Sequence, residues 1–518
     1  MRGVGSFAAV DLGATSGRVM LATLTPDADG ARVDLRQVRR FSHDPLPVSG
    51  ELHWNVSRLF SEVREGLRDA ERLAGGLSGI GVDTWAVDYG LLDRSGALLG
   101  DPFNYRDPRT LGVPEQMFAH VSASQFHARC GLQVQPFNTI FQLVAAARTT
   151  TWADVRHLLL MPDLFGFWLT GRAVAEITNA STTGLLDVRH RIWSRATLDD
   201  LRSIWGIPAA DFLPDLVEPG TVLGPVSASV LGTDAEMVAV GTHDTASAIV
   251  AVPASGSDFA YISSGTWSLV GLELDAPVLT EASREANFTN ELGVDGTVRY
   301  LRNITGLWVL SESIRTWAEA GLRVDLANLI AAASDLPALG TVVDINDATL
   351  LPPGDMPTRI AALAAAAGEP VPHSPAEFTR CILDSLALAH RLAVRQACEL
   401  AGRDVSVVHM VGGGTNNELL CRLTAEATGL TVVAGPDEGT ALGNVLVQAR
   451  ALGALEGDLD ALRRVAAASC DLTRYRPGTV AGLGEDAWRR AERRITGSAG
   501  APLVPPHHRP SPSTTTRR

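Results

Sequence analysis

Residues 7–24 read FAAVDLGATSGRVMLATL, a pattern typical of two buried strands joined by a tight turn. One apolar run ends at Asp11, small residues occupy positions 13–17, and a second apolar run begins at Val19. Two interpretations stay open at this point. The stretch is either a plain hairpin in which Gly and Ser serve the turn, or a turn whose exposed backbone N–H groups bind phosphate.

The composition is that of a large globular protein. With 518 residues the chain is too long for a single core, so two large domains are expected. Hydrophobic residues make up 46% and charged residues 20% of the chain, and no apolar stretch is long enough to cross a bilayer. Asp11 and Arg18 interrupt the N-terminal apolar region where a signal peptide would lie. We therefore expect a cytoplasmic protein.

The charged residues exclude several classes of function. A net charge of −14 argues against a nucleic-acid partner, although backbone dipoles still permit anionic ligands. All 44 basic residues are arginine, so a Walker A loop and the Schiff-base and pyridoxal phosphate mechanisms are excluded. A phosphate site must therefore use backbone N–H groups, Arg or a metal. Five cysteines without CxxC spacing make a disulfide framework and structural zinc unexpected.

A second run–turn–run pattern, FAYISSGTWSLVGLEL, occupies residues 259–274. It matches the opening stretch in pattern, which suggests two related domains. Further along, the spacing predicts a helix over 378–402, a strand over 405–411, and a Gly-rich loop leading into a helix that stops at Gly429. Such alternation predicts mixed α/β layers. The expected domains are 1–248 and 249–485, followed over 486–518 by the end of a C-terminal helix and a Pro-, Ser- and Thr-rich disordered tail.

Two further motifs contain candidate functional residues, each with a structural alternative. Asp244, in GTHDTAS, is either a helix N-cap or a base at the end of a strand, where ligands gather in α/β folds. Trp85 lies near Asp83 and Asp88, which is common in sugar sites and equally common in a core strand. His243 and Asp244 have no useful metal-binding spacing, so no metal site made only of protein ligands is expected.

The Gly-rich motif at 412–414 does not match a dinucleotide-binding fingerprint, because Asn417 stands where that fingerprint requires Gly or Ala. The three glycines either permit close approach of a flat or charged group or form a flexible connector. Neither a GxSxG elbow nor an HExxH helix occurs in the chain, so no local signature supports hydrolase chemistry.

Taken together, the motifs resemble those of the FGGY family of carbohydrate kinases. The matching segments, over roughly residues 7–480, are DLGATSGR, DTWAVDYGLLD, YRDPRT, PFNTIFQL, TNASTTGLLD, GTHDTASA, SSGTWSL, NITGLW and VGGGTNN. They are most similar to the family members that phosphorylate L-rhamnulose, which tend to have Ile-Phe-Gln after PFNT, as at 140–142. The resemblance implies an α/β, actin-like and hexokinase-like ATPase fold with two ribonuclease H-like domains around a cleft.

The resemblance also implies roles for individual residues. Asp244 would be the catalytic base, and Asp11 would orient Mg²⁺, through water. The implied ATP-binding residues are Ala14, Thr15, Ser16, Gly17 and Arg18 in the first turn, Thr266 in the second turn, Ser311, and Gly413 and Gly414 in the Gly-rich loop. The implied sugar-binding residues are Trp85, Ala86, His243, Asp244, Thr245 and Asn303.

The implied activity is phosphorylation of the C1 hydroxyl of a ketose, L-rhamnulose, with ATP and Mg²⁺ as cofactors and with no nucleic-acid or membrane partner. The first domain would bind the sugar, and the second would bind the nucleotide. Two alternatives stay open: an FGGY kinase for L-fuculose, ribulose, xylulose or glycerol, and a non-catalytic actin-like nucleotide switch, which needs no base at Asp244. Ala86 replaces a Gly near the sugar and Ser311 replaces a longer Gln near the nucleotide, so both bear on ligand preference.

Overall fold

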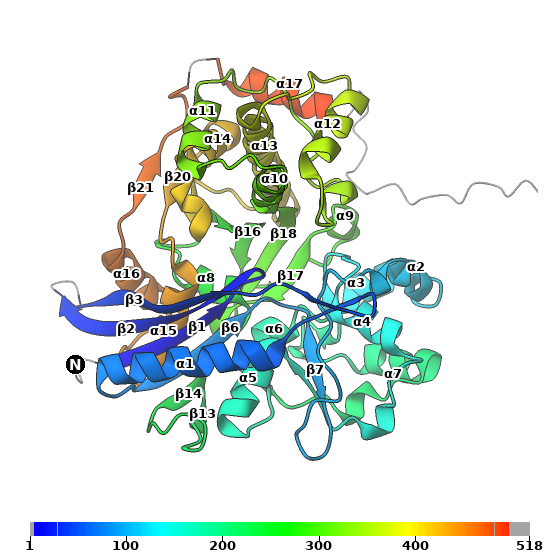
Figure 1. Ribbon diagram of the computed structural model, residues 1–518, viewed down its shortest axis with the longest axis vertical. Coiled ribbons are helices and arrows are strands. Elements are labelled where there is room, and N and C mark those ends of the chain that lie inside the picture. The colour runs from blue at the N-terminus through cyan, green and yellow to red at the C-terminus, as the bar shows by residue number, and fades with distance from the viewer. Residues whose placement is uncertain (1–4, 28–29, 481, 497–518) are drawn as a thin grey trace, which may run out of the picture.

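The computed structural model describes residues 5–27, 30–480 and 482–496, and this part of the chain is built around two β-sheets with helices packed on their faces (Figure 1). The predicted disordered tail beyond about residue 496 lies outside the described residues. Among the helices of the described part, none is long and apolar enough to span a membrane.

The first sheet has six strands in the order β13-β14-β6-β1-β2-β3. Its central strand, β1, pairs antiparallel with β2 and parallel with β6, so the predicted opening hairpin is confirmed. The strands are β1 (Ser6–Leu12), β2 (Ser16–Asp27), β3 (Gly30–Ser42), β6 (Gly79–Thr84), β13 (Thr221–Pro225) and β14 (Glu236–Ala239).

The second sheet has seven strands in the order β17-β18-β16-β15-β19-β20-β21. Strand β15 pairs antiparallel with β16 and parallel with β19, which repeats the arrangement around β1 and confirms the second predicted hairpin. The strands are β15 (Phe259–Ser264), β16 (Trp267–Leu274), β17 (Thr289–Leu292), β18 (Val298–Thr305), β19 (Val407–Val411), β20 (Thr431–Ala434) and β21 (Thr473–Tyr475).

Helices and short two-stranded sheets complete the described part of the chain. The helices before β15 are α1 (Val56–Ala74), α2 (Val113–Phe118), α3 (Ala123–Cys130), α4 (Thr139–Ala146), α5 (Met161–Thr170), α6 (Ile177–Ala180), α7 (Arg195–Trp205) and α8 (Asp244–Val250). Those after it are α9 (Glu281–Glu285), α10 (Trp308–Glu319), α11 (Leu326–Ser334), α12 (Met356–Ala366), α13 (Pro375–Ala401), α14 (Glu418–Thr428), α15 (Gly439–Ala451), α16 (Leu459–Ser469) and α17 (Glu485–Thr496). The short sheets pair β4 (Leu46–Val48) with β5 (Glu51–His53), β7 (Tyr89–Leu92) with β8 (His157–Leu160), β9 (Ala175–Glu176) with β12 (Leu216–Val217), and β10 (Leu186–Asp187) with β11 (Ile192–Trp193).

Local sequence signals account for where the predicted helices begin and end. Helix α13 begins with a capping box formed by Ser374 and Glu377, and it ends at Gly402, whose φ of 62° places it in the left-handed region. Helix α14 likewise ends at Gly429, with φ of 71°. The helices predicted over 378–402 and up to Gly429 are therefore confirmed.

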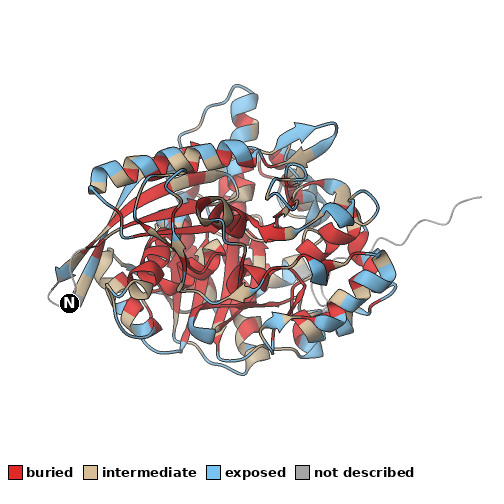
Figure 2. Ribbon diagram, turned by 90° about the horizontal axis from the view of Figure 1, so that it is seen from below, coloured by how far each residue is buried: buried red, intermediate tan, exposed pale blue. Residues whose placement is uncertain are grey.

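Helix α15 belongs to the second half of the chain but packs under the first sheet. A Cβ atom added to Gly443 would lie 1.8 Å from the carbonyl oxygen of Ser247 in α8, and one added to Gly81 in β6 would lie 2.3 Å from Asn444 Oδ1. Glycine at both positions therefore permits the close approach of the three elements. Buried side chains of α15 share one cluster with Phe7 of β1, and Figure 2 shows buried residues concentrated in the sheets and on the inward faces of the helices.

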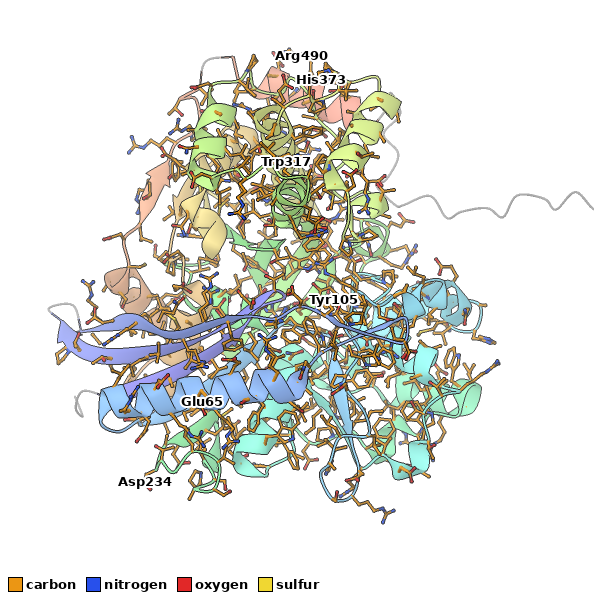
Figure 3. The ribbon with its side chains drawn as sticks, in the orientation of Figure 1. Glu65, Tyr105, Asp234, Trp317, His373 and Arg490 are labelled. Carbon is orange, nitrogen blue, oxygen red and sulfur yellow. The ribbon has the colours of Figure 1, made fainter. Side chains whose placement is uncertain are left out.

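A row of aromatic rings connects the first sheet to the hairpin of the second. The ring centroids are 6.5 Å apart between Trp54 and Tyr105, 5.5 Å between Tyr105 and Phe137, and 5.9 Å between Phe137 and Trp267. Figure 3 places Tyr105 in the region where the two halves of the molecule meet. Aromatic pairs at these separations attract one another and bury large apolar surfaces, so the row holds the two halves together.

The approach of α15 to α8 predicts a specific effect on stability. The change Gly443→Ala should lower the melting temperature by several degrees, because overpacking against backbone typically costs about 1–3 kcal/mol. Gly166→Ala in α5 is the matched control, since its nearest neighbour would be Met237 Cε at 3.6 Å, and alanine is the better helix former by about 1 kcal/mol. Thermal melts followed by circular dichroism compare the two variants, and a Gly443→Ala protein as stable as the control would contradict the close packing.

Candidate active site

The turn of the first hairpin exposes backbone between β1 and β2. The amide of Gly13 donates a hydrogen bond of 3.0 Å to the carbonyl oxygen of Ser16, and Thr15 at the tip is exposed. Close packing requires glycine at position 17, because a Cβ atom there would lie 2.5 Å from the Phe41 ring and 2.6 Å from the Leu12 side chain. The predicted ATP-binding segment from Ala14 to Arg18 therefore covers the turn and the first three residues of β2, and only Arg18 in it carries a large side chain.

The turn of the second hairpin lies against the start of α10. The amides of Leu307 and Trp308 donate hydrogen bonds of 3.1 Å to the carbonyl oxygens of Gly265 and Thr266, respectively. Gly306 makes this contact possible, since a Cβ atom there would lie 2.5 Å from the carbonyl carbon of Trp267. Thr266 therefore lies beside the first turn of α10, where the predicted nucleotide residue Ser311 is exposed.

The Gly-rich loop after β19 packs on the end of β15. Gly412 has φ of +88°, and a Cβ atom added to it would lie 2.9 Å from the carbonyl oxygen of Ser264. A Cβ atom added to Gly414 would lie 2.0 Å from Ser264 Oγ. Gly413 is different, because no described atom lies within 4 Å of its added Cβ position. The loop therefore contacts the second hairpin through Gly412 and Gly414 and leaves Gly413 open to a ligand.

Buried carboxylates gather beside the first turn. Asp11 is 2% exposed and Asp83 is fully buried. Burial raises the pKa of Asp11 to about 6, a rise that Arg18 opposes and that Asp244 and Glu438 reinforce. Burial also raises the pKa of Asp83 well above its ordinary value, and the charges of Asp11 and Asp244 add to the rise. The three aspartates are therefore close enough to repel one another.

Polar groups from both halves of the chain compensate this repulsion. Arg18 Nε lies 3.0 Å from Asp11 Oδ2, and Arg18 Nη1 donates to both carboxylate oxygens of Glu438, at 2.9 and 2.7 Å. Asn444 Nδ2 donates to Asp83 Oδ2 at 2.6 Å. Asn444, within α15, is therefore a partner of the carboxylate cluster, whereas Glu438, immediately before that helix, holds Arg18 and adds a further negative charge.

The same carboxylates suit a hydrated magnesium ion. Asp83 Oδ1 is buried and accepts no hydrogen bond from the described residues, whereas Asp11 Oδ2 has the ion pair with Arg18. Carboxylate oxygens are ligands that Mg²⁺ prefers. Across residues 5–27, 30–480 and 482–496, no cluster of three metal-ligating side chains occurs. This arrangement fits an ion held by one or two carboxylates together with waters and substrate phosphates.

Asp244 is the first residue of α8, and His243 occupies the N-cap position without a side-chain capping bond. The N-cap alternative for Asp244 is therefore wrong. Within the described residues, the polar contacts of the Asp244 side chain fall on one oxygen, Oδ1. Oδ1 accepts hydrogen bonds from the backbone amide of Thr245 at 2.6 Å and from its hydroxyl at 3.2 Å, and it lies 3.3 Å from His243 Nε2. The second oxygen, Oδ2, has no polar contact among the described residues.

Glu176 holds the loop that precedes Asp244. Its Oε2 accepts hydrogen bonds from the Thr242 amide at 3.0 Å, from the Thr242 hydroxyl at 2.7 Å, and from the Thr178 hydroxyl at 2.5 Å. Burial raises the pKa of Glu176, although these hydrogen bonds oppose the rise. A buried carboxylate with several donors is a rigid anchor, so the backbone leading to Asp244 has one position.

The structure places the Trp85 side chain in the core. Its indole nitrogen donates to Asp88 Oδ2 at 3.0 Å, its ring centroid lies 4.2 Å from that of Trp54, and the residue is 5% exposed. The adjacent Ala86 is half-buried. On the side of the second sheet, the half-buried Asn303 donates from Nδ2 to Gln133 Oε1 at 2.9 Å.

Several polar residues that surround the predicted site were not predicted from the sequence: Glu176, Glu291, Arg299, Glu438 and Asn444. They are far along the chain from the residues that they contact, and strand pairing and helix packing bring them together. One signal was available for Glu291, which is an acidic residue in the otherwise uncharged segment TNEL (289–292). A carboxylate that is buried requires a charged or hydrogen-bonding partner.

Known proteins are similar to this chain over most of its length. Residues 7–251 match the N-terminal domain of the FGGY family of carbohydrate kinases, and residues 260–452 match its C-terminal domain. The chain is 41% identical to the rhamnulokinase of Pectobacterium carotovorum subsp. carotovorum, over 94% of this chain and 96% of that protein. It is 40% identical to the rhamnulokinase of Enterococcus faecalis, over 88% and 91%, respectively.

Solved structures show the same two-domain sugar kinase fold. A gluconate kinase from Lactobacillus acidophilus superposes with a TM-score of 0.73 at 16% identity, covering 95% of this chain and 96% of that one. A Plasmodium falciparum glycerol kinase with ADP superposes with a TM-score of 0.75 at 13% identity, covering 95% and 98%. The predicted α/β two-domain fold is therefore confirmed.

The carboxylate cluster predicts a pH-dependent gain of stability for Asp83→Asn in metal-free buffer. The folded protein binds the Asp83 proton more tightly than the unfolded chain, whose ordinary pKa is 3.8, so wild-type stability falls as the pH rises above that value. The variant keeps an acceptor for Asn444 but carries no charge. Its melting temperature should exceed that of wild type at pH 8, and the difference should shrink toward pH 4.

Asp234→Asn is the control, because this exposed carboxylate lies outside the cluster. Its melting temperature should follow that of wild type at every pH. A difference between Asp83→Asn and wild type that stays constant with pH would contradict the repulsion among the buried aspartates.

Proposed function

Because the chain belongs to the FGGY family of carbohydrate kinases, we propose that this carbohydrate kinase transfers the γ-phosphoryl group of ATP to the C1 hydroxyl of L-rhamnulose. The sugar is proposed from the curated relatives, which are rhamnulokinases about 40% identical over most of their length. The observation that carries the chemistry is Asp244, which has one oxygen occupied by donors and lies beside the carboxylate cluster and the first turn.

In this proposal, the oxygen of the sugar hydroxyl attacks the γ-phosphorus of ATP, and ADP leaves. Asp244 accepts the proton that the hydroxyl loses in this step. Backbone amides of residues 13–17, with the guanidinium of Arg18, bind the β- and γ-phosphates from one side, and Thr266 binds them from the other. Gly413 and Ser311 lie toward the nucleoside. Mg²⁺, held by Asp11 and Asp83 through water, would neutralise phosphate charge when bound. Catalysis by positioning and charge compensation is what phosphoryl transfer requires.

The sugar lies, in the same proposal, between the two halves of the molecule. Ala86, His243 and Thr245 contribute from residues 1–248, and Asn303 contributes from residues 249–485, which also bind the nucleotide. Because Trp85 is buried, we propose that it supports Ala86 from behind instead of stacking on the sugar ring. As a soluble enzyme that consumes ATP, the protein would act in the cytoplasm.

The first test replaces the base. Asp244→Asn keeps an oxygen that accepts the hydrogen bond from the Thr245 amide, so the fold and the melting temperature should change little. An amide accepts no proton at neutral pH, so kcat should fall by about 10²- to 10⁴-fold, with nearly unchanged KM for ATP. Stopped-assay kinetics together with a thermal melt measure both effects.

The matched control is Asp325→Asn, the same chemical change at the N-cap of α11, where the side chain accepts from the Asn328 amide. Its kcat should equal that of wild type. If Asp244→Asn turns over within a few-fold of wild type, Asp244 is not the base, and the proposed mechanism is wrong.

The second test concerns the sugar. A coupled ADP-release assay over ketoses and polyols should give the highest kcat/KM with L-rhamnulose, ahead of L-fuculose, ribulose, xylulose and glycerol. Ala86→Gly removes one methyl group near the sugar, and a methyl in a pocket is worth about 1–3 kcal/mol of discrimination. The variant should therefore change the ranking among sugars more than KM for ATP. A higher kcat/KM with another ketose would identify a different FGGY kinase.

A further inference from the structure

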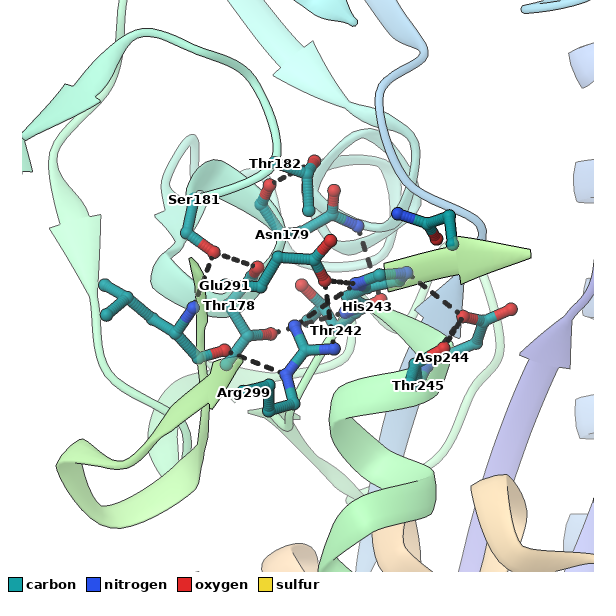
Figure 4. Close-up of polar contacts among 12 residues, drawn as sticks. Thr178, Asn179, Ser181, Thr182, Thr242, His243, Asp244, Thr245, Glu291 and Arg299 are labelled. Carbon is teal, nitrogen blue, oxygen red and sulfur yellow. Dashed lines mark hydrogen bonds and ion pairs between the residues drawn. The ribbon is translucent and has the colours of Figure 1, made fainter. Parts of the chain in front are cut away.

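The edge of the second sheet contacts the loop that precedes Asp244. Strand β17 brings Glu291 to His243, and its neighbour β18 brings Arg299 to the same imidazole (Figure 4). His243 Nδ1 lies 3.1 Å from Glu291 Oε2 and 3.2 Å from Arg299 Nη2. The other ring nitrogen, Nε2, lies 3.3 Å from Asp244 Oδ1. One imidazole therefore stands between Asp244 and a charged pair from the other half of the chain.

The charged pair is buried and held in place. The side chains of Glu291 and Arg299 are 6% and 0% exposed, and Arg299 Nη1 lies 3.1 Å from Glu291 Oε2. Arg299 Nε also donates to the carbonyl oxygen of Leu292 at 3.2 Å, and the Leu292 amide donates to Ser181 Oγ at 2.9 Å. The second of these bonds joins β17 to a residue next to α6, so the edge strand has a defined position relative to the loop.

The charges of the pair are also settled. Burial by itself would raise the pKa of Glu291, but the charges of Arg299 and His243 outweigh burial and lower the pKa below its ordinary value. Glu291 is therefore ionised at neutral pH. An ionised carboxylate and a guanidinium at one nitrogen of an imidazole restrict where that ring can carry its protons.

Two protonation forms of His243 agree with these distances. In the imidazolium form, Nδ1–H faces Glu291 and Nε2–H faces Asp244. In the neutral form with its proton on Nε2, Nδ1 accepts the hydrogen bond from Arg299, and Nε2–H again faces Asp244. The remaining tautomer would place the lone pair of Nε2 against the Asp244 carboxylate and also Nδ1–H against the Arg299 guanidinium, and both contacts are repulsive. In both permitted forms a proton on Nε2 faces Asp244 Oδ1.

We propose that Glu291 and Arg299 are positioning residues, which keep His243 as a donor to one oxygen of Asp244 and so direct the other oxygen at the substrate hydroxyl. This inference rests on the proposed role of Asp244 as the base. Because Glu291 and Arg299 belong to the second sheet, Asp244 is oriented for reaction only while the edge of that sheet is docked on the loop. The position of one half of the molecule then controls the base carried by the other half.

The test compares two replacements of Glu291. Glu291→Leu offers no acceptor to Nδ1 and no charge to Arg299, so kcat should fall by roughly 10- to 100-fold, the size of effect expected from a misplaced catalytic group. Glu291→Gln keeps an acceptor of the same shape and should recover most of that loss. KM for ATP should stay within about twofold in both variants, because neither residue lies at the phosphate turns.

Glu273→Leu is the matched control. Glu273 also lies in the second sheet and pairs with a buried arginine, Arg463, at 2.7 Å, but it does not contact His243 in the described structure. Breaking either buried pair should lower the melting temperature, whereas only Glu291→Leu should lower kcat measured per folded molecule. Equal kcat in Glu291→Leu and Glu273→Leu would overturn the proposal. Should Glu291→Leu fail to fold, Arg299→Gln takes its place, because it removes the guanidinium that contacts both Glu291 and His243. Its kcat should fall, whereas kcat of Glu291→Gln should stay near that of wild type, and equal kcat in these two variants would overturn the proposal.

A double-mutant cycle separates this proposal from the proposed function. In the Asp244→Asn background, Glu291→Leu should have no further effect on kcat, because the residue acts through Asp244. If Asp244→Asn is inactive but Glu291→Leu remains fully active, the base stands and the positioning role is wrong. If the two losses multiply, Glu291 acts on another group, which also overturns the proposal. An active Asp244→Asn enzyme would overturn both.

Discussion

The mutual repulsion of Asp11, Asp83 and Asp244, of which the first two are buried and the third is partly exposed, is the constraint on which the site depends. Asp11 and Asp83 lie at the ends of adjacent parallel strands, and Asp244 begins the helix that follows a third strand of the same sheet. Burying two carboxylates beside a third is costly unless each finds a partner. Arg18 and Asn444 supply two of those partners, and His243 with the Thr245 amide supplies the third.

These partners explain why the two halves of the chain share a core. Asn444 reaches Asp83 only because α15 packs directly beneath β1 and β6, and α15 packs there only because Gly81 and Gly443 carry no side chain. The same helix is preceded by Glu438, which binds Arg18. A kinase needs negative groups beside the phosphates to place a cation and a base, and here the fold supplies the compensation for that arrangement from the opposite half.

The two sheets contain the same arrangement of a hairpin beside a parallel strand. In each sheet the hairpin is antiparallel, and a glycine permits close packing beside its turn. Gly17, at the start of β2, packs against Phe41 and Leu12, and Gly306, before α10, packs against the backbone of the second hairpin. Narrow turns leave amide groups uncovered for an anion, which suits a chain that contains no lysine. Asp244, the proposed base, follows a strand of the first sheet, and the edge strand β17 of the second sheet contacts its neighbour His243.

What could be predicted from the sequence is local. Small residues between apolar runs indicate both hairpins, Gly402 and Gly429 mark helix ends, and the absence of lysine excludes whole classes of phosphate site, because each of these properties depends on neighbouring residues or on composition alone. The motif resemblance added the family and the residues implied by it. It did not place Asp244 at the first helical position or show that the Trp85 indole is buried against Asp88.

Only the tertiary structure determined how the charges near Asp244 are compensated and which residues contact His243 beside it. Arg18 and Glu438 are 420 positions apart in the chain, and Asp83 and Asn444 are 361 apart. Glu291 meets His243 through the docking of a sheet edge. No periodicity or spacing records such contacts, since they depend on how elements formed independently pack against one another. The sequence by itself therefore determined which local elements form and which chemistry is possible, because both depend on neighbouring residues and composition. Packing between the two halves decided which residues contact His243 beside Asp244, because those residues come from elements far apart in the chain.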